Sequence, residues 1–503
     1  MTAEKRAQQA VPSIRIDVRN DLPVNVSGQF ILYWMIMHRR RRYNFGLQRA
    51  VELALESGKP LVVFEALRCG YRWANDRIHG FVLQGMEGNA RTFADAPVTY
   101  FPYVEPEAGA GKGLLAALAA RASAVVTDAF PCFMLPQMVT AASKQIRTRF
   151  EVVDSNGLAP LAAADKAYGR AVDFRRFLQK VLPDHLQHVP AADPLQDVQL
   201  PSLGKFPEAI TARWPKATAA MLSSTRAALA MLPIDHGVGP AVFDGGSDAA
   251  MKRLDLFVRK RLAQYAEDRS DPDLDGTSCM SPYLHFGHIS VHEIFARIAK
   301  KESWSLTDLN AAPSGKREGW WGMSTAAEAY LDELVTWREL AYNLCDQCPD
   351  TYSTYECVPE WARRTLEQHA SDERPYRYSI DELEAAATHD PVWNAAHTQL
   401  VRDGWFHNSM RILWAKKILE WSAHPREALA TMIHLMNKYA VDGRNPNSYA
   451  GFLWTLGRYD RPWFDRPIFG TVRYVSSENT VRKRRLTGYL KKYSALPFSL
   501  TTD

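Results

Sequence analysis

The pattern of apolar and polar residues changes along the chain and predicts two structural halves. In the N-terminal half, apolar runs of about four to seven residues occur at 30–34, 61–64, 98–104, 124–127 and 150–153. Segments with apolar residues three and four apart, such as 44–55, separate these runs. Strands that alternate with helices are typical of a parallel sheet covered by helices on both faces. We therefore expect a Rossmann-like α/β domain over residues 1–173.

The C-terminal half has the pattern of a helical protein. Apolar residues recur three and four apart over 251–265, 326–344, 405–421 and 425–439. This spacing predicts an all-α domain over residues 240–503. The intervening segment, 174–239, is interrupted by Pro183, Pro190, Pro194, Pro201 and Pro207. Prolines at this density favour a linker that wraps the surface.

Composition and charge narrow the class of protein. The chain has 503 residues, of which 46% are hydrophobic and 23% charged, so it is neither disordered nor of low complexity. Its formal net charge is +5, and residues 471–503 hold seven Lys or Arg against Glu478 and Asp503. A basic segment is typical of nucleic-acid binding, but it also increases solubility. Both interpretations remain open on charge alone.

Cysteine usage and hydropathy predict the compartment. Six cysteines in 503 residues are too few for a disulfide scaffold, which favours a reducing environment. The first residues, MTAEKRAQQAVPS, lack the apolar stretch of a signal peptide, and no apolar run approaches the 18 residues of a membrane span. We expect a soluble cytoplasmic protein that does not associate with membranes.

Three short motifs suggest chemistry but have simpler explanations. The glycine-rich stretch AGAGKGLL at 108–115 lacks the Ser or Thr that follows Lys in a phosphate-binding loop, so a flexible helix start is favoured. The single CxxC at 345–348 lacks a second pair, which favours buried thiols over zinc. His288 and His292 would share a helix face without forming a known metal motif. We expect no metal.

The tryptophans are concentrated in the helical half, where eleven of the fourteen follow residue 300. Trp414 and Trp421 are seven residues apart, which places them on one helix face, about 10.5 Å apart along the axis. Such a row is either core packing or a path for stepwise electron transfer. The order of residues alone does not choose between the two.

Six ordered segments resemble the class II DNA photolyases of the cryptochrome/photolyase family. They are YLHFGHIS (283–290), LDELVTWREL (331–340), HDPVWNAAHTQLVRDGW (389–405), MRILWAKKILEW (410–421), KYAVDGRNPNSYAG (438–451) and DRPWFDRPIFGTVRY (460–474). YWM (33–35) and residues 75–86 are similar to the same class.

The resemblance implies the photolyase/cryptochrome fold, with an α/β antenna domain followed by an all-α domain that holds FAD in a folded conformation. It implies light-driven repair of cyclobutane pyrimidine dimers in UV-damaged DNA by a monomer, through an electron passed from excited reduced FAD to a flipped lesion. An antenna chromophore is possible, but its identity does not follow from the sequence.

The resemblance also assigns the flavin site. It implies that FAD is held by Tyr265, Thr277, Ser278, Met280, Ser281, Arg338, Arg411, Asp442 and Asn447. Hydroxyls and backbone amides at a helix start suit the FAD phosphates, because they offer donors where the helix dipole is positive. The family pairs Arg411 with Asp442 beside the flavin ring, and a guanidinium there would favour the anionic reduced flavin.

The remaining implied residues concern the lesion, the DNA and the electron supply. Glu333 matches the carboxyl that hydrogen-bonds the dimer, which stabilises a developing anion only if the acid is protonated. By the same resemblance, the flipped dimer would pack against Trp337 and Trp454, and DNA would contact Arg461 and Arg473. The proximal, medial and distal tryptophans of the family's electron chain match Trp414, Trp393 and Trp421.

Four features depart from the family pattern. Met436 stands where class II members place an asparagine facing flavin N5, Tyr342 replaces a typical Asp, the loop before Asp460 is one residue shorter, and residues 39–42 are four arginines. A thioether is at best a weak hydrogen-bond acceptor. A cryptochrome-like blue-light sensor, or another flavin photoenzyme on the same scaffold, is therefore an alternative to repair. A nucleic-acid-binding protein without flavin is a third.

Overall fold

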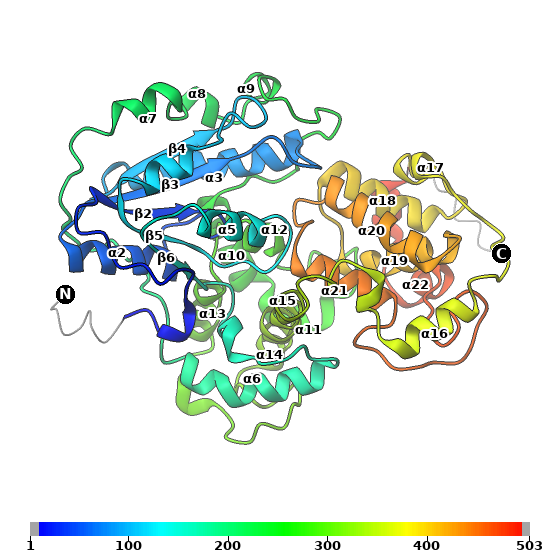
Figure 1. Ribbon diagram of the computed structural model, residues 1–503. Coiled ribbons are helices and arrows are strands. Elements are labelled where there is room, and N and C mark those ends of the chain that lie inside the picture. The colour runs from blue at the N-terminus through cyan, green and yellow to red at the C-terminus, as the bar shows by residue number, and fades with distance from the viewer. Residues whose placement is uncertain (1–9, 495–503) are drawn as a thin grey trace.

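The computed structural model describes residues 10–494 and contains a six-stranded sheet in its N-terminal half (Figure 1). Its strands are β1 (Ile16–Val18), β2 (Phe30–Met35), β3 (Leu61–Leu67), β4 (Thr99–Val104), β5 (Ala122–Asp128) and β6 (Arg149–Val153), in the order β1-β6-β5-β2-β3-β4. All neighbours are parallel except β1, which runs antiparallel to β6. The apolar pattern predicts β2 to β6 but not β1, because β1 is short and largely exposed.

The two faces of β2 contribute to two different cores. Side chains alternate across a strand, so Ile31, Tyr33 and Met35 share one face. They pack in a buried cluster with residues of α2 (Phe45–Ser57). Phe30 and Trp34 point to the opposite face and belong to a buried cluster that continues into the helical half. The sheet is therefore one wall of the core that supports the C-terminal helices.

Helices complete the α/β half. They are α3 (Asp76–Ala94), α4 (Leu114–Ala119) and α5 (Leu135–Ser143). The expected linker over 174–239 is partly helical: α7 (Glu208–Arg213), α8 (Ala219–Leu222) and α9 (Arg226–Ala230) lie along the α/β half (Figure 1). Leu222 and Leu229 pack in one cluster with Leu83 of α3. The prolines thus separate short helices that cover the α/β half.

The expected domain boundary at residue 173 falls inside a helix, α6 (Ala171–His185). Phe174, Leu178 and Leu182 of α6 are buried in a cluster with residues of the helical half. Pro183 lies near the end of α6 and is compatible with it. The first part of the segment therefore belongs to the packing of the helical half.

Fourteen further α-helices follow in the part of the chain that the structure describes (Figure 1). They are α10 (Ser247–Lys260), α11 (Tyr265–Asp268), α12 (Ser281–His285), α13 (Val291–Lys301), α14 (Thr325–Leu331), α15 (Arg338–Gln347), α16 (Glu360–Gln368), α17 (Ile380–Glu384), α18 (Pro391–Asp403), α19 (Asn408–Trp421), α20 (Pro425–Tyr439), α21 (Pro446–Thr455), α22 (Ser477–Lys483) and α23 (Thr487–Tyr493). Within residues 10–494, no helix is long and apolar enough to cross a membrane. Residues 1–9 and 495–503 lie outside the described residues. They hold the start of the expected α/β domain and the end of the expected all-α domain with its basic segment.

Arginines connect the two halves. Arg77 of α3 is buried and donates hydrogen bonds to the carbonyls of Gly239, Leu400, Val401 and Tyr439 at 2.6–3.2 Å. The four arginines at 39–42 also donate hydrogen bonds within the protein. Arg39 donates to Glu65 and Arg40 to the carbonyl of Gly287, while Arg41 donates to Asp193 and Arg42 to Glu293. Two of these partners, Gly287 and Glu293, lie in the helical half. The basic stretch therefore has internal partners and holds the halves together.

Candidate functional site

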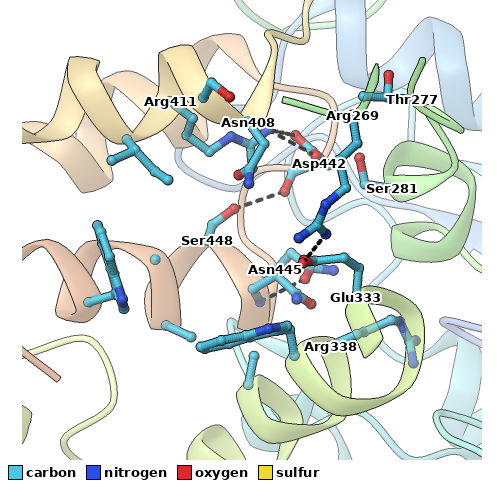
Figure 2. A pocket seen from close by; sticks show the side chains of 18 of the residues that line it. Arg269, Thr277, Ser281, Glu333, Arg338, Asn408, Arg411, Asp442, Asn445 and Ser448 are labelled. Atoms are coloured by element: carbon cyan, nitrogen blue, oxygen red, sulfur yellow. Dashed lines mark hydrogen bonds and ion pairs between the residues drawn. The ribbon is translucent and has the colours of Figure 1, made fainter. Parts of the chain in front are cut away.

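A cavity of about 560 Å³ lies in the helical half, between α11, α12, α15, α19 and α21 (Figure 2). It brings together thirteen of the residues that the family resemblance implies. They are Tyr265, Thr277, Ser278, Met280, Ser281, Glu333, Trp337, Arg338, Arg411, Trp414, Asp442, Asn447 and Trp454. The lining does not include Met436, Trp393, Trp421, Arg461 or Arg473.

A π-helical turn, η5 (Asp332–Trp337), joins α14 to α15 and supplies part of the wall. The predicted continuous helix over 326–344 is therefore interrupted here. Glu333, Leu334 and Trp337 of this turn all line the cavity. A π turn departs from the regular α-helical ladder and is frequent at functional sites. This one places a carboxyl group and an indole on the same wall.

Glu333 has one charged partner inside the cavity. Arg269 Nη1 lies 2.5 Å from Glu333 Oε1, and Figure 2 shows the two side chains directed at each other. One third of the Glu333 side chain is exposed. Burial raises the pKa of Glu333, and the guanidinium of Arg269 opposes this increase.

Arg269 was not among the residues implied by the resemblance. It follows Tyr265 by four residues, and its guanidinium lies 5.7 Å from the centre of the Tyr265 ring. Residues four apart share a helix face. That spacing is the sequence signal that could have identified Arg269 once Tyr265 had been placed at the site.

Arg411 and Asp442 form an ion pair across the cavity (Figure 2). Arg411 Nη2 lies 3.2 and 3.3 Å from the two carboxylate oxygens of Asp442, which is 4% exposed. The Nε of Arg411 is buried and has no hydrogen-bond partner among the described residues. A buried donor without a partner costs about 1–3 kcal/mol. Arg411 lines the cavity, so a ligand bound there would lie against its side chain.

Amides and a further arginine line the cavity besides the implied residues. Asn408, Asn445 and Arg484 are among them. Asn445 Nδ2 lies 3.0 Å from His285 Nδ1, which fixes the orientation of its amide. Arg484 belongs to the basic segment and lies between α22 and α23. Single polar residues of this kind carry no spacing signal in the sequence.

Arg338 connects the cavity to the α/β half. Its guanidinium donates to the carbonyl of Asn156 at 2.7 Å and to the hydroxyl of Tyr342 at 3.1 Å. It also lies 4.4 Å from the centre of the Tyr342 ring. Tyr342, which departs from the family pattern, therefore serves as a partner for Arg338.

Met436 and Asn437, near the end of α20, are both fully buried. Met436 has no exposed surface and does not line the cavity. The neighbouring Asn437 accepts a hydrogen bond from the backbone N–H of Arg444 at 2.7 Å and donates to Tyr449 at 3.4 Å. Its amide is thus committed to the following loop, so it does not replace the missing asparagine.

Three indoles lead away from the cavity. Trp414 lines it, and Trp393 donates from Nε1 to the Trp414 carbonyl at 3.0 Å. The ring centres of Trp393 and Trp421 are 5.3 Å apart. Trp421 in turn contacts the rings of Tyr378 and His389 at 5.0 and 5.6 Å. The order of the three indoles from the cavity matches the proximal, medial and distal order that the resemblance implies.

Basic and aromatic side chains gather beside Trp454. Arg473 lies 2.6 Å from Asp460, 4.3 Å from the Trp463 ring and 5.7 Å from the Trp454 ring. The guanidinium of Arg461 lies 5.5 Å from the Trp463 ring. The loop is open to solvent, with Trp463 39% exposed. Arg461 and Arg473 therefore lie next to the cavity wall at Trp454 rather than in it.

The chain is similar to known proteins over almost its whole length. It is 32% identical to the deoxyribodipyrimidine photo-lyase of Methanothermobacter thermautotrophicus, over 96% of this chain and 98% of that protein. It is 33% identical to the deoxyribodipyrimidine photo-lyase of Oryza sativa subsp. japonica, over 93% and 90% of the two chains. No family model matches.

Two solved structures share the fold. The class III photolyase of Agrobacterium tumefaciens superimposes with a TM-score of 0.67 at 17% identity, over 93% of this chain and 86% of that one. A cryptochrome of Synechocystis gives a TM-score of 0.66 at 14% identity, over 92% and 88%. At these identities the similarity establishes the architecture, which is the expected α/β half followed by a helical half.

Proposed function

The chain belongs to the deoxyribodipyrimidine photo-lyase family, and on this premise we propose that it repairs cyclobutane pyrimidine dimers in UV-damaged DNA under blue light. The observation that carries the proposal is the single cavity that joins Glu333, Trp337 and Trp454 to the Arg411–Asp442 pair. The quoted sequence segments further favour class II. We infer that the protein acts as a cytoplasmic monomer.

The chemistry of the cavity wall fits FAD. Three hydroxyls, those of Thr277, Ser278 and Ser281, line one region and suit phosphate oxygens. Arg411, which lines the cavity and pairs with Asp442, supplies a positive charge beside it. When bound, reduced FAD would supply the electron that opens the dimer after it absorbs blue light, and it would take the electron back afterwards.

The lesion would lie against the wall made by η5 and α21. Trp337 and Trp454 offer flat apolar surfaces for two flipped bases, which leave a damaged duplex at low cost. Glu333 would donate a hydrogen bond from its protonated carboxyl to the developing negative charge, and burial favours this protonated form. Arg269 would be displaced or shared when the lesion enters, since it is the present partner of Glu333.

The DNA would approach along the loop next to Trp454. Arg461 is exposed, and Arg473 is half-exposed and already paired with Asp460. An exposed arginine loses little on contacting a phosphate, so Arg461 contributes more to DNA affinity than Arg473.

Repair of a defined substrate tests the proposal. The purified protein, with its flavin reduced, is mixed with an oligonucleotide that contains one thymine dimer, and restored thymines are counted in blue light and in darkness. The proposal expects repair in light only, with many dimers repaired per protein. Equal product in light and darkness, or none in either from protein that carries flavin, would overturn it.

A blue-light sensor on the same scaffold is the second candidate, and Met436 is the observation that favours it. Met436 is fully buried at the position where the family pattern has an amide. A sensor would bind FAD in the same cavity and be reduced by light through the same indoles. It would give no restored thymines in the assay above, so the two candidates are separated by one experiment.

A further inference from the structure

His397 of α18 lies between the first two tryptophans of the row. Its ring centre is 5.0 Å from that of Trp393, with an interplanar angle of 4°, and 6.3 Å from that of Trp414, with an angle of 1°. The imidazole is fully buried. The three rings therefore lie nearly parallel to one another, in a row that begins at the cavity.

A hydrogen bond links His397 to the indole that lines the cavity. Trp414 Nε1 donates to His397 Nδ1 at 3.1 Å. An indole nitrogen is only a donor, so Nδ1 carries the lone pair and the imidazole is in its neutral form. Burial lowers the pKa of His397 to about 4, which keeps the ring neutral near pH 7.

Trp393 is held differently. Its Nε1 donates to the backbone carbonyl of Trp414, which is a neutral amide oxygen. The acceptor for the Trp414 N–H is instead the Nδ1 lone pair of His397, whose ring is nearly coplanar with the indole. Of the two inner tryptophans, Trp414 therefore has the more basic acceptor, on the indole nearest the cavity.

We propose that His397 is a positioning residue that makes Trp414 the electron donor of the row. When Trp414 gives one electron to bound flavin, positive charge develops on its indole, and the Nδ1 lone pair stabilises it through the N–H group. No covalent bond is made or broken. The electron is replaced from Trp393, then from Trp421, and finally from a reductant in solution. This inference rests on the proposed flavin photochemistry.

The test separates the acceptor from the ring. His397→Phe keeps a flat ring and removes the acceptor, whereas His397→Gln keeps an acceptor oxygen and removes the ring. Photoreduction of the flavin is followed by absorbance in blue light with an external thiol, at equal flavin content. We expect His397→Phe to be about fivefold slower than the parent, and His397→Gln to stay within about twofold.

A second measurement responds to the acceptor and not to folding. Transient absorption after a laser flash records the yield of oxidised tryptophan, which should fall in His397→Phe and remain in His397→Gln. His236→Phe, at a half-exposed histidine outside the row, is the matched control and should leave both measurements unchanged. If His397→Phe does not fold, His397→Leu replaces it, because leucine also lacks an acceptor.

Parent-like rates and yields in both His397 variants would overturn the proposal, and so would equal losses in the two. Trp414→Phe distinguishes this failure from failure of the proposed function. If Trp414→Phe photoreduces as fast as the parent, the indole row does not carry the electron, and the proposed electron path fails independently of His397.

Discussion

Arg77 and Arg411 show how differently two regions of the molecule use an inward-facing arginine. Arg77 lies between the α/β and helical halves, is 3% exposed, and directs its guanidinium at four carbonyls. Arg411 lies in the cavity, pairs with Asp442 through one nitrogen, and leaves Nε buried without a partner. Arg77 donates from all three of its guanidinium nitrogens, whereas Arg411 donates to Asp442 from Nη2.

This contrast distinguishes side chains that stabilise the fold from side chains that would bind a ligand. Buried donors are normally satisfied, because an unsatisfied one costs free energy. The interface between the halves follows this rule with its arginines, and the cavity departs from it. We therefore expect changes at the interface to lower stability, and changes in the cavity to lower binding or repair while the fold persists.

The largest effect on stability is expected from Arg77→Met. The substitution leaves the carbonyls of Val401 and Tyr439 without their charged donor, and each buried unsatisfied acceptor costs about 1–3 kcal/mol. The free energy of unfolding in urea should fall by at least about 2 kcal/mol. Arg364→Met, at an exposed i,i+4 pair with Glu360, is the control and should change it by less than about 0.5 kcal/mol. Similar losses in both variants would remove the distinction.

The cavity should respond in the opposite way. Glu333→Ala removes the carboxyl proposed to donate to the lesion, so repair per bound flavin should fall at least about tenfold. Because the group is one third exposed, stability should change little. Glu87→Ala on α3, a half-exposed glutamate, is the control. Unchanged repair in Glu333→Ala would show that this carboxyl does not assist the reaction.

The sequence predicts the strands of the sheet well and the charged contacts poorly. The run at 61–64 identifies β3, which extends to Leu67, because a buried parallel strand is apolar on both faces. The apolar pattern does not predict β1, because none of its three residues, Ile16–Val18, is buried. The place of Asn408 in the cavity and the partners of residues 39–42 depend on segments far apart in the chain, and local patterns do not report such contacts.

The interface between the halves should also be sensitive to acid. Burial lowers the pKa of His38, His288 and His292 below the ordinary value of 6.5, for His288 to about 3. The unfolded chain binds protons at these rings near pH 6.5, whereas the folded chain does not. The free energy of unfolding should therefore fall below pH 6.5, by about 1.4 kcal/mol per pH unit for each ring, until the folded pKa is reached.

His292→Phe tests the origin of this acid sensitivity. The ring packs edge-on against Phe45 at 5.5 Å, which phenylalanine can reproduce. Between pH 6.5 and 5, the slope of the free energy of unfolding against pH should decrease by the contribution of one histidine ring. His188→Phe, at an exposed histidine, should leave the slope unchanged. Identical slopes in the parent and His292→Phe would show that His292 is not kept neutral.

The smallest effect is expected at Met436. Met436→Asn introduces an amide where the family pattern has one, and one hydrogen bond contributes about 0.5–1.5 kcal/mol. If that amide reaches flavin N5, the separation between the two one-electron potentials of the bound flavin should change by a corresponding amount in a redox titration. Met432→Asn, at another buried methionine of α20, is the control for inserting an amide into this helix. Unchanged potentials would place the N5 contact elsewhere.

The stabilisation of the protein by added FAD tests the central comparison most directly. This stabilisation is the difference between the melting temperatures measured with and without FAD. It is measured for the parent, for Arg77→Met and for Arg411→Lys. Arg411→Lys keeps the positive charge but loses the planar guanidinium group. We predict that Arg77→Met melts lower in both conditions and retains the full difference. Arg411→Lys should melt like the parent without FAD and lose most of the difference. A full difference in Arg411→Lys would contradict the account, because the guanidinium of Arg411 would then have no part in binding.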